Sequence, residues 1–199
     1  MNKMKVVKAT TLTQINRKQM SEIFVEGWYH DLKIFHKDKA RLIKTFEHIF
    51  NLSCFYVGVQ EEEILGFIAI CDRKKEKYHQ FNKKEFRKNL GFLRGTFAYI
   101  AMKRVLDKPY PFQIPQNAGV IEAVGVHPSA RGKGIAHHLL EVSMEKEHFD
   151  CYILEVVDNN ETAIRLYERL GFKEFTRIDS PYPEKYTGFK EILYMELKK

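Results

Sequence analysis

The chain has 199 residues, a length that suits one domain with a substantial hydrophobic core and no need of disulfides or metals for stability. Hydrophobic residues make up 44% and charged residues 30%, as in an ordinary globular protein, and the formal net charge is +7. The positive charge is local, because residues 72–117 hold 12 Lys/Arg against 4 Asp/Glu while the rest holds 21 against 22, and this argues against a general nucleic-acid binder.

Cysteine usage and hydropathy exclude further classes. Three widely spaced cysteines without a CxxC pair predict reduced thiols in a cytoplasmic protein rather than a zinc site or a disulfide framework. The first ten residues lack the apolar core of a signal peptide. No run approaches the ~20 apolar residues of a membrane span, so we expect none.

The first seventy residues predict two helices and a β-hairpin. A weakly alternating run at 5–10 fits a first strand, and segments 13–29 and 38–50 carry apolar side chains near the helical period. Such apolar stripes are expected to pack in the core. Two apolar runs, 54–59 and 64–71, flank an acidic turn and therefore predict the hairpin.

Residues 72–118 predict a basic helical insertion. Residues 74–88 are basic and compatible with a helix, and apolar side chains then recur at spacings near 3.6 residues. This apolar stripe comprises Phe86, Leu90, Leu93, Phe97, Ile100 and Ala101. Gly91 and Gly95 would allow close approach of another helix or backbone. The insertion could cap the core, form an oligomer interface, act as a lid or, less favoured, lie on a membrane surface as an amphipathic helix.

Residues 120–140 combine a strand, a glycine-rich turn and a helix. The strand at 120–126 is apolar or small except for Glu122, and Pro128 breaks it. Gly132 and Gly134 then open a helical pattern. Because glycine lets a ligand approach the backbone and a helix start offers unpaired N–H groups, this order fits a phosphate or pyrophosphate site. Turn chemistry without a ligand would give the same two glycines.

The remaining elements are a strand, a helix and two final strands. Residues 151–157 read as another buried strand, and residues 161–170 as a helix that Gly171 ends. Residues 173–178 and 192–197 read as the last two strands.

Two motifs in this half of the chain resemble those of the GNAT superfamily of N-acetyltransferases. The pyrophosphate loop of that superfamily, [RQ]xxGx[GA], is matched by Arg131, Gly134 and Ala136. A second signature, NxxAxxLYExxGF, is matched over residues 160–172. The resemblance is close over about residues 118–175 and loose elsewhere, and the long segment before residue 118 departs from the usual plan of the superfamily.

The resemblance implies a single α/β domain over residues 1–199, with a mixed, mostly antiparallel central sheet, flanking helices and the helical insertion. It implies acetyl-CoA as co-substrate, no metal, and direct transfer of the acetyl group to a primary amine of a small molecule or peptide. The strands at 120–126 and 151–157 would splay apart around the pantetheine arm. The implied cofactor-binding residues are Val124, Val126, Arg131, Gly132, Lys133, Gly134, Ile135, Ala136, Asn160, Ala163 and Tyr167.

Glu122 and Tyr167 are the expected catalytic residues. Glu122 is the one ionisable side chain of its strand, and burial would raise the pKa of a glutamate toward the range of a general base. The resemblance implies that Tyr167 protonates the departing thiolate. Glu122 could instead be a structural partner in an ion pair, and Tyr167 could only pack. Trp28 and Tyr29 could line the acceptor cleft, which the first helical region borders in the superfamily.

Other functions remain open. A catalytically silent acyl-CoA-binding or regulatory module is the main alternative, and the presence of Glu122 and Tyr167 weighs against it. Binding of the basic segment to anionic surfaces or to nucleic acid is a rival from another class, although we expect no nucleic-acid partner. A homodimer is left open. The sequence does not identify the acceptor, but basic side chains of the insertion would favour one with a carboxylate or phosphate beside its amine. The side chains considered for this are Lys83, Lys84, Arg87 and Lys88.

Overall fold

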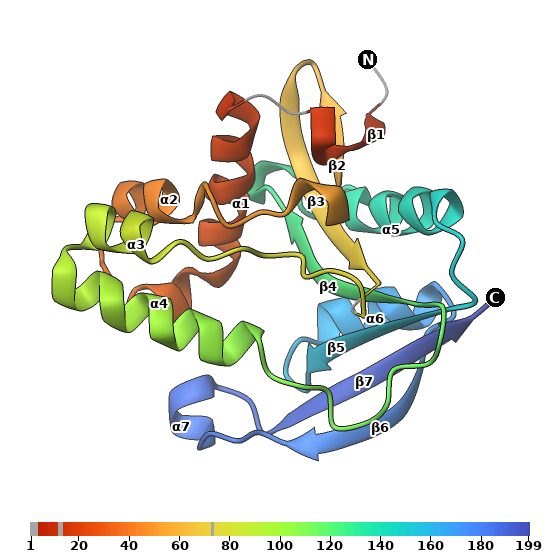
Figure 1. Ribbon diagram of the computed structural model, residues 1–199. Coiled ribbons are helices and arrows are strands. Elements are labelled where there is room, and N and C mark those ends of the chain that lie inside the picture. The colour runs from red at the N-terminus through yellow and green to blue at the C-terminus, as the bar shows by residue number, and fades with distance from the viewer. Residues whose placement is uncertain (1–3, 12–13, 73) are drawn as a thin grey trace.

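A single mixed sheet organises the chain (Figure 1). The computed structural model describes residues 4–11, 14–72 and 74–199. The strand order is β1-β2-β3-β4-β5-β7-β6, and among these neighbours only β4 and β5 run parallel. The expected mostly antiparallel α/β sheet is thus confirmed. The strands are β1 (Lys5–Lys8), β2 (Phe55–Gln60), β3 (Glu63–Cys71), β4 (Ala118–Val126), β5 (Cys151–Val157), β6 (Lys173–Asp179) and β7 (Glu191–Lys198).

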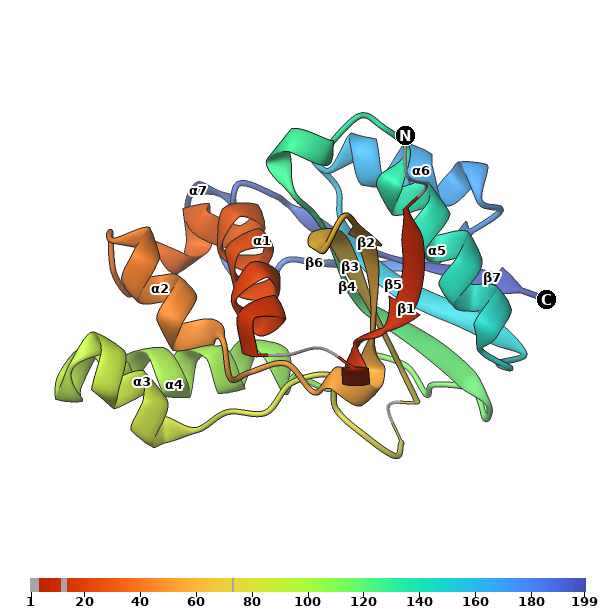
Figure 2. The same ribbon diagram turned by 90° about the horizontal axis from the view of Figure 1, so that it is seen from above.

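Helices cover the two faces of the sheet (Figure 2). Helices α1 to α4 lie on one face, and α5 and α6 on the other. Short 3-10 turns lie at Ala9–Thr11, Leu52–Cys54 and Pro128–Ala130. The helices are α1 (Gln14–Leu32), α2 (Lys39–Phe46), α3 (Lys83–Leu90), α4 (Phe92–Leu106), α5 (Ile135–Lys146), α6 (Glu161–Arg169) and α7 (Glu184–Thr187).

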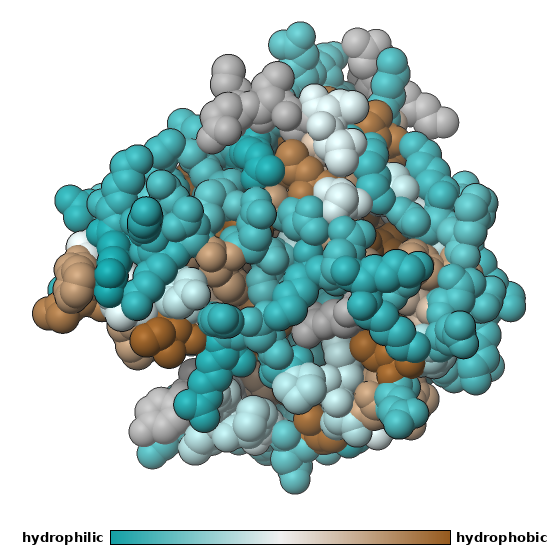
Figure 3. All heavy atoms as spheres, in the orientation of Figure 1, coloured by the Kyte–Doolittle hydropathy of each residue, from teal (hydrophilic) through white to brown (hydrophobic). Residues whose placement is uncertain are grey.

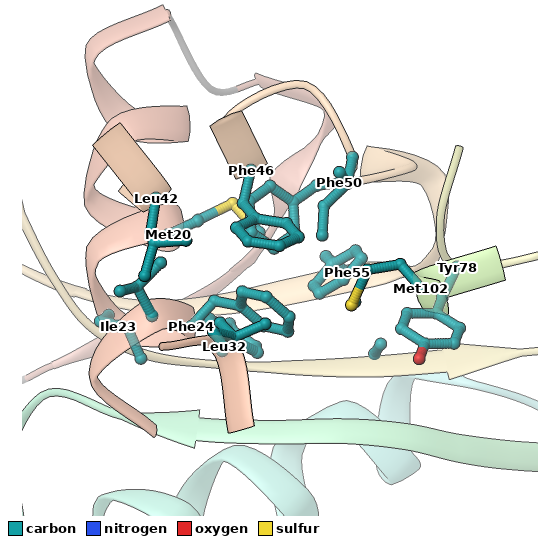
Figure 4. Packing of buried hydrophobic residues seen from close by; sticks show 14 of the residues in the cluster. Met20, Ile23, Phe24, Leu32, Leu42, Phe46, Phe50, Phe55, Tyr78 and Met102 are labelled. Carbon is teal, nitrogen blue, oxygen red and sulfur yellow. The ribbon is translucent and has the colours of Figure 1, made fainter. Parts of the chain in front are cut away.

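The larger core cluster is aromatic and lies between α1, α2 and the β2–β3 hairpin (Figure 4). The Phe24 ring contacts the Phe46 and Phe50 rings at centroid distances of 5.3 and 6.0 Å, and Phe50 in turn contacts Phe55 at 5.4 Å. Edge-to-face and tilted aromatic contacts of this kind add stabilisation beyond the buried area. The apolar stripes of the first two helices are therefore core packing, as their period predicts.

The second helix is shorter than its apolar pattern predicts. It begins after Asp38, whose carboxylate caps the backbone N–H groups of Ala40 and Arg41. It ends at Phe46 because the following backbone forms sheet-like bonds instead. Asn51 N–H donates to Tyr78 O at 3.0 Å, and residues 49 and 80 are joined by a second bond of 2.8 Å. Residues 47–50 are therefore not helical.

The insertion contains two helices, α3 and α4, rather than one continuous helix. Residues 74–82, compatible with a helix by sequence, are not helical: Tyr78 and Gln80 bond to residues 49–51 as just described, and α3 begins after the cap Asn82. Gly91 has φ +83°, a conformation that breaks the helix between α3 and α4. A Cβ at Gly95 would clash with the backbone of Phe86, so this glycine lets the two helices approach closely.

The apolar stripe of the insertion divides between two environments. Its first part, Phe86 and Leu90, is buried in the aromatic core cluster. Its later part, Leu93, Phe97 and Ile100, is exposed, because α4 buries a different row of small and flexible side chains. The stripe is therefore buried before the Gly91 break and exposed at these three positions after it. The small buried row of α4 is Gly95, Ala98 and Met102.

The segment after α4 returns the chain to the sheet. The Phe112 ring contacts the Tyr194 ring at 5.1 Å and the Phe175 ring at 4.9 Å, which ties residues 107–117 to β7 and β6 (Figure 1). Phe112 and Ile114 also cover a small cluster at the start of β4 and β5. In the described part of the chain, no helix has the length and apolar character needed to cross a membrane.

Candidate active site

A pocket opens where β4 and β5 diverge. The two strands pair only over Ala118–Ile121 and Cys151–Leu154. Beyond this point β4 stays paired with β3 as far as Val126, while β5 stays paired with β7 as far as Val157. The strands therefore splay, and a pocket of about 230 Å³ lies at the opening. Its lining residues are Trp28, Ile121, Glu122, Ala123, Val124, Glu155, Val156, Val157, Asn160, Tyr167 and Ile192.

Glu122 occupies an irregularity in β4. The β3–β4 register pairs Ala69 with Ala123 and Ile70 with Ile121, so Glu122 is an extra residue that pairs with no residue of β3. A β-bulge of this kind re-aims a side chain and is common beside active sites. Glu122 is half-buried and lines the pocket. The bulge explains how a charged residue is tolerated in an otherwise apolar central strand.

Asn160 and Tyr167 reach the pocket from α6. The Asn160 side chain caps this helix by accepting a hydrogen bond from Ala163 N–H at 3.3 Å. Tyr167 is buried, and its ring packs against Phe172 at 5.9 Å. Burial raises the pKa of Tyr167 to about 12, so its phenol stays protonated at neutral pH. Among the described residues, the hydroxyl of Tyr167 has no hydrogen-bond partner.

Trp28 is brought to the pocket by a kink in α1. Its backbone is non-helical, with φ −114° and ψ 17°, and its ring stacks on Phe24 at 4.9 Å. Tyr29 does not line the pocket. Its hydroxyl donates to Lys37 O at 2.8 Å, and the Lys39 ammonium lies over its ring. Of the two aromatic residues expected beside an acceptor, the structure therefore brings only Trp28 to this site.

The glycine-rich turn lies between the end of β4 and the start of α5. Gly132 has φ +74° and Gly134 φ +75°, and an added Cβ would meet no atom within 4 Å at either position. Gly134 is the N-cap of α5 and supplies no side chain to bond the first amides. The first N–H groups of α5 lie at the positive end of the helix dipole, beside these two open glycine positions, and suit an anion. Arg131 and Lys133 are exposed beside them.

Most of the expected cofactor-binding residues fall into two groups. Val124, Asn160 and Tyr167 line the pocket. Residues 131–136 lie beyond it, around the start of α5, and Val126 connects the two regions through β4. Arg131 is tied to this end of β4, because its Nε donates to Val126 O at 3.3 Å. Ala163 is half-buried on α6 and packs in the core cluster under α5 and α6.

Two charged residues of the site were not among those expected from the sequence. Glu155 of β5 lines the pocket, and its Oε2 forms an ion pair with Lys108 Nζ at 3.0 Å. Burial and a hydrogen bond with Glu155 raise the pKa of Tyr194 to about 12. Glu155 is the one acidic residue in its apolar strand, the same signal that marked Glu122. No local signal marks Lys108, because its partner is distant in the sequence.

The basic residues of α3 lie elsewhere. The Lys83 ammonium sits over the Tyr99 ring, and the Arg87 Nε donates to Thr96 Oγ1 at 2.9 Å, so these side chains face α4. Lys88 lies 3.9 Å from Glu85 on the same helix. Within the described part of the insertion, the basic residue that reaches a pocket-lining acid is Lys108.

Comparison with known sequences places these features in a family. The chain matches the model of the acetyltransferase (GNAT) family over residues 12–172. It is 37% identical over 92 residues to N-alpha-acetyltransferase 30 of Saccharomyces cerevisiae, covering 45% of this chain and 52% of that protein. It is 38% identical over 73 residues to mycothiol acetyltransferase of Mycobacteroides abscessus, covering 35% and 22%. The matches thus span about half or less of these relatives' lengths.

Solved structures of low sequence identity share the fold. An N-acetyltransferase from Staphylococcus aureus Mu50 superimposes with a TM-score of 0.63 at 17% identity, covering 97% of this chain and all (100%) of that chain. The NatC complex bound to Gag peptide and CoA gives a TM-score of 0.56 at 15% identity, with 100% and 99% covered. With a family match that extends over most of its length, the chain belongs to the acetyltransferase (GNAT) family.

Proposed function

We propose that this protein transfers the acetyl group of acetyl-CoA directly to a primary amine. The observation that carries the proposal is the divergence of β4 and β5, which opens a pocket holding Glu122 and Tyr167 beside unpaired strand edges. Family membership supports acetyl-CoA as the co-substrate. In this proposal residues 1–199 form one catalytic domain, with residues 72–118 as an insertion.

Acetyl-CoA would lie along β4 and across the start of α5. Its pyrophosphate would bind the amides from Gly132 to Ala136, where the glycines leave the backbone open, with Arg131 and Lys133 adding positive charge. The pantetheine arm would bond the edge of β4 around Val124 and Val126 like an added strand. Asn160 and Ala163 would contact the arm from the first turn of α6.

Glu122 is proposed as the general base. An acceptor amine enters as an ammonium ion and must lose a proton before it attacks the thioester. The bulge aims the carboxylate of Glu122 into the pocket, where it removes that proton directly or through a water molecule. Glu155, whose Oε2 forms an ion pair with the Lys108 ammonium at 3.0 Å, is proposed to hold the acceptor rather than to act as the base.

Tyr167 is proposed as the proton donor to the departing thiolate. The pKa of Tyr167, at about 12, lies ~3.5 units above the ~8.5 typical of a thiol, so full transfer is uphill by roughly 5 kcal/mol. That is well below the barrier of about 16 kcal/mol that corresponds to a turnover of about 10 s⁻¹. Hydrogen bonding from the protonated phenol would stabilise the developing thiolate before the proton moves.

Direct transfer is supported by the cysteines. Cys54, Cys71 and Cys151 are buried, and none of them lines the pocket. A hydrogen bond with Cys54 and burial both raise the pKa of the Cys71 thiol, so it stays protonated and a poor nucleophile. An acetyl-cysteine intermediate is therefore disfavoured. Buried reduced thiols also support the proposal of a cytoplasmic protein.

The acceptor is proposed to present its amine to two carboxylates and an aromatic wall. Glu122 and Glu155 line the pocket with Trp28, an arrangement that attracts an ammonium group. Lys108 at its margin would favour an acceptor with a carboxylate or carbonyl dipole near that amine. A peptide N-terminus or a small amino compound fits this description, and the similarity to an N-alpha-acetyltransferase supports the former.

A thiol-release assay tests the activity. The protein is incubated with acetyl-CoA and pools of small amines, amino acids and short peptides, and free CoA is measured against reactions without amine. Acceptor-dependent release is expected. If CoA binds but no pool releases thiol, the alternative of a silent acyl-CoA-binding module replaces this proposal.

A comparison of Lys108→Gln with Lys83→Gln then distinguishes the effect of the cation at the pocket from the effect of the insertion's overall positive charge. Loss of the cation paired with Glu155 should raise the acceptor KM and leave the KM of acetyl-CoA unchanged. Lys83→Gln removes the same charge from α3 and should change neither KM. Equal effects of the two substitutions would contradict the assigned role of Lys108.

A further inference from the structure

Helix α4 exposes an apolar row on the side opposite its buried row. Leu93 is 80% exposed, Phe97 54% and Ile100 56%. Their spacing of four and three residues places them on one side of the helix over two turns. The Phe35 ring contacts the Phe97 ring at 5.8 Å, and this brings Ile34, which is 70% exposed, into the neighbourhood of the row. A helix that is apolar on both sides is stable only when its second side also packs against another apolar surface.

Positive charge surrounds this row. Helices α3 and α4 together carry seven Lys/Arg and one Glu between residues 83 and 106. Arg94 adjoins the row, and Arg104 continues it four residues after Ile100. Both arginines are exposed. Figure 3 shows hydrophobic side chains reaching the surface over the α3–α4 region with hydrophilic side chains around them.

We propose that the outer face of α4 docks on an anionic lipid bilayer surface. Exposed Leu, Phe and Ile side chains enter the boundary between headgroups and acyl chains, and the surrounding Lys and Arg side chains bind the anionic headgroups. The helix would lie in the plane of the surface, since α3 and the aromatic core cluster cover its other side. This function is separate from acetyl transfer.

The charge favours lipid over the other occupants of such a face. A second copy joined through a two-fold axis would bring Arg94, Lys103 and Arg104 of α4 against their own copies, and like-charge contacts oppose association. A nucleic acid would use the cations but would leave Leu93 and Ile100 without apolar contacts, since such interfaces are polar. An anionic bilayer surface offers both acyl chains for the exposed apolar row of α4 and anionic headgroups for the cations around it.

Co-sedimentation of the full chain with lipid vesicles tests the proposal. Vesicles of phosphatidylcholine alone are compared with vesicles that also contain phosphatidylglycerol, at low and at high salt. Binding is expected to the anionic vesicles, with little to the neutral ones, and it should weaken at high salt because surface charges are screened.

Substitutions on α4 identify the surface that binds. Leu93→Gln with Ile100→Gln removes the apolar contact and should weaken vesicle binding roughly tenfold or more. Arg94→Gln with Arg104→Gln should weaken it about 30-fold, since each cation near an anionic surface contributes about a fivefold factor. All four positions are exposed, and circular dichroism with thermal melting confirms that each variant is folded.

A matched control removes two charges elsewhere. Lys5 and Lys173 are exposed on β1 and β6, and Lys5→Gln with Lys173→Gln should leave vesicle binding within about twofold, although the net charge falls by the same amount. Several results would overturn the proposal: no binding to anionic vesicles, equal weakening by the control pair, or unchanged binding after the Leu93 and Ile100 substitutions. A dimer in sedimentation velocity that those two substitutions convert to monomer would assign the face to a second copy instead.

Discussion

Replacing Gly134 with Asp probes the proposed pyrophosphate site at the start of α5. Gly134 has φ 75° and ψ 8°, and its Cα faces open space. The left-handed backbone costs about 1 kcal/mol for most residues and less for Asp or Asn, so the variant should fold with a melting temperature only about 2–4 °C lower. Its carboxylate, however, would stand where a phosphate is proposed to bind.

The expected loss of CoA affinity follows from the charges. Two like charges about 4 Å apart repel by about 1 kcal/mol in water and about 4 kcal/mol at an effective dielectric constant of 20. This range corresponds to roughly 5-fold to nearly 1,000-fold in the dissociation constant. Because the turn is exposed but adjoins a folded helix start, we expect a loss of at least about tenfold in calorimetric titration with CoA.

Two control variants isolate the charge effect. Gly134→Asn keeps the shape and backbone strain without the charge and should lose much less affinity. Gly188→Asp introduces the same charge at a nearly identical backbone conformation, φ 77° and ψ 4°, at the end of α7, and should leave CoA affinity unchanged. A folded Gly134→Asp protein with wild-type affinity, or equal losses for Asp and Asn at this position, would refute the anion-site reasoning.

Three further predictions concern the catalytic pair and stability. Glu122→Gln should lower turnover by ~10²–10⁴-fold and spare CoA affinity, and a wild-type rate from about pH 6 to about pH 9 would make Glu122 structural. Tyr167→Phe keeps the ring contact with Phe172 but removes the proton donor, so turnover should fall while the melting temperature stays within a few degrees; unchanged turnover would leave Tyr167 a packing residue. Burial opposes ionisation of Glu147, but hydrogen bonds of 2.8 Å each from Lys8 and Tyr56 lower its pKa. The stabilisation by ionised Glu147 is therefore present above about pH 4.5 and lost as the pH falls. Glu147→Gln should flatten this part of the profile of melting temperature against pH, and an unchanged profile would show that these hydrogen bonds do not contribute to stability.

Local patterns explain why much of the fold was predictable. Continuous apolar runs predicted β4 and β5, because a strand buried on both faces tolerates few polar side chains. Asn160 and Gly171 marked the two ends of α6, since capping depends on residues within one turn. The glycines at 132 and 134 predicted a turn with an open backbone, and their positive φ angles agree.

In the insertion, the helical spacing of apolar side chains alone did not predict which of them are buried. Helical spacing predicted an apolar stripe across Gly91, but it could not show that the backbone reverses its φ there. Once the helix breaks, the stripe continues on a different side of the fold, and Leu93 becomes exposed while Phe86 stays buried. The pattern cannot show this, because which side of α4 faces the core depends on packing against α3.

The sequence by itself determined the sheet-and-helix order, the acidic residue in β4 and the glycine turn before α5, because each depends on neighbours within a few residues. Tertiary structure alone decided that β4 and β5 part after Ile121, that a bulge aims Glu122 into the opening and that Lys108 meets Glu155 there. These features join segments far apart in the chain, and their geometry is set by sheet register and packing rather than by any local preference.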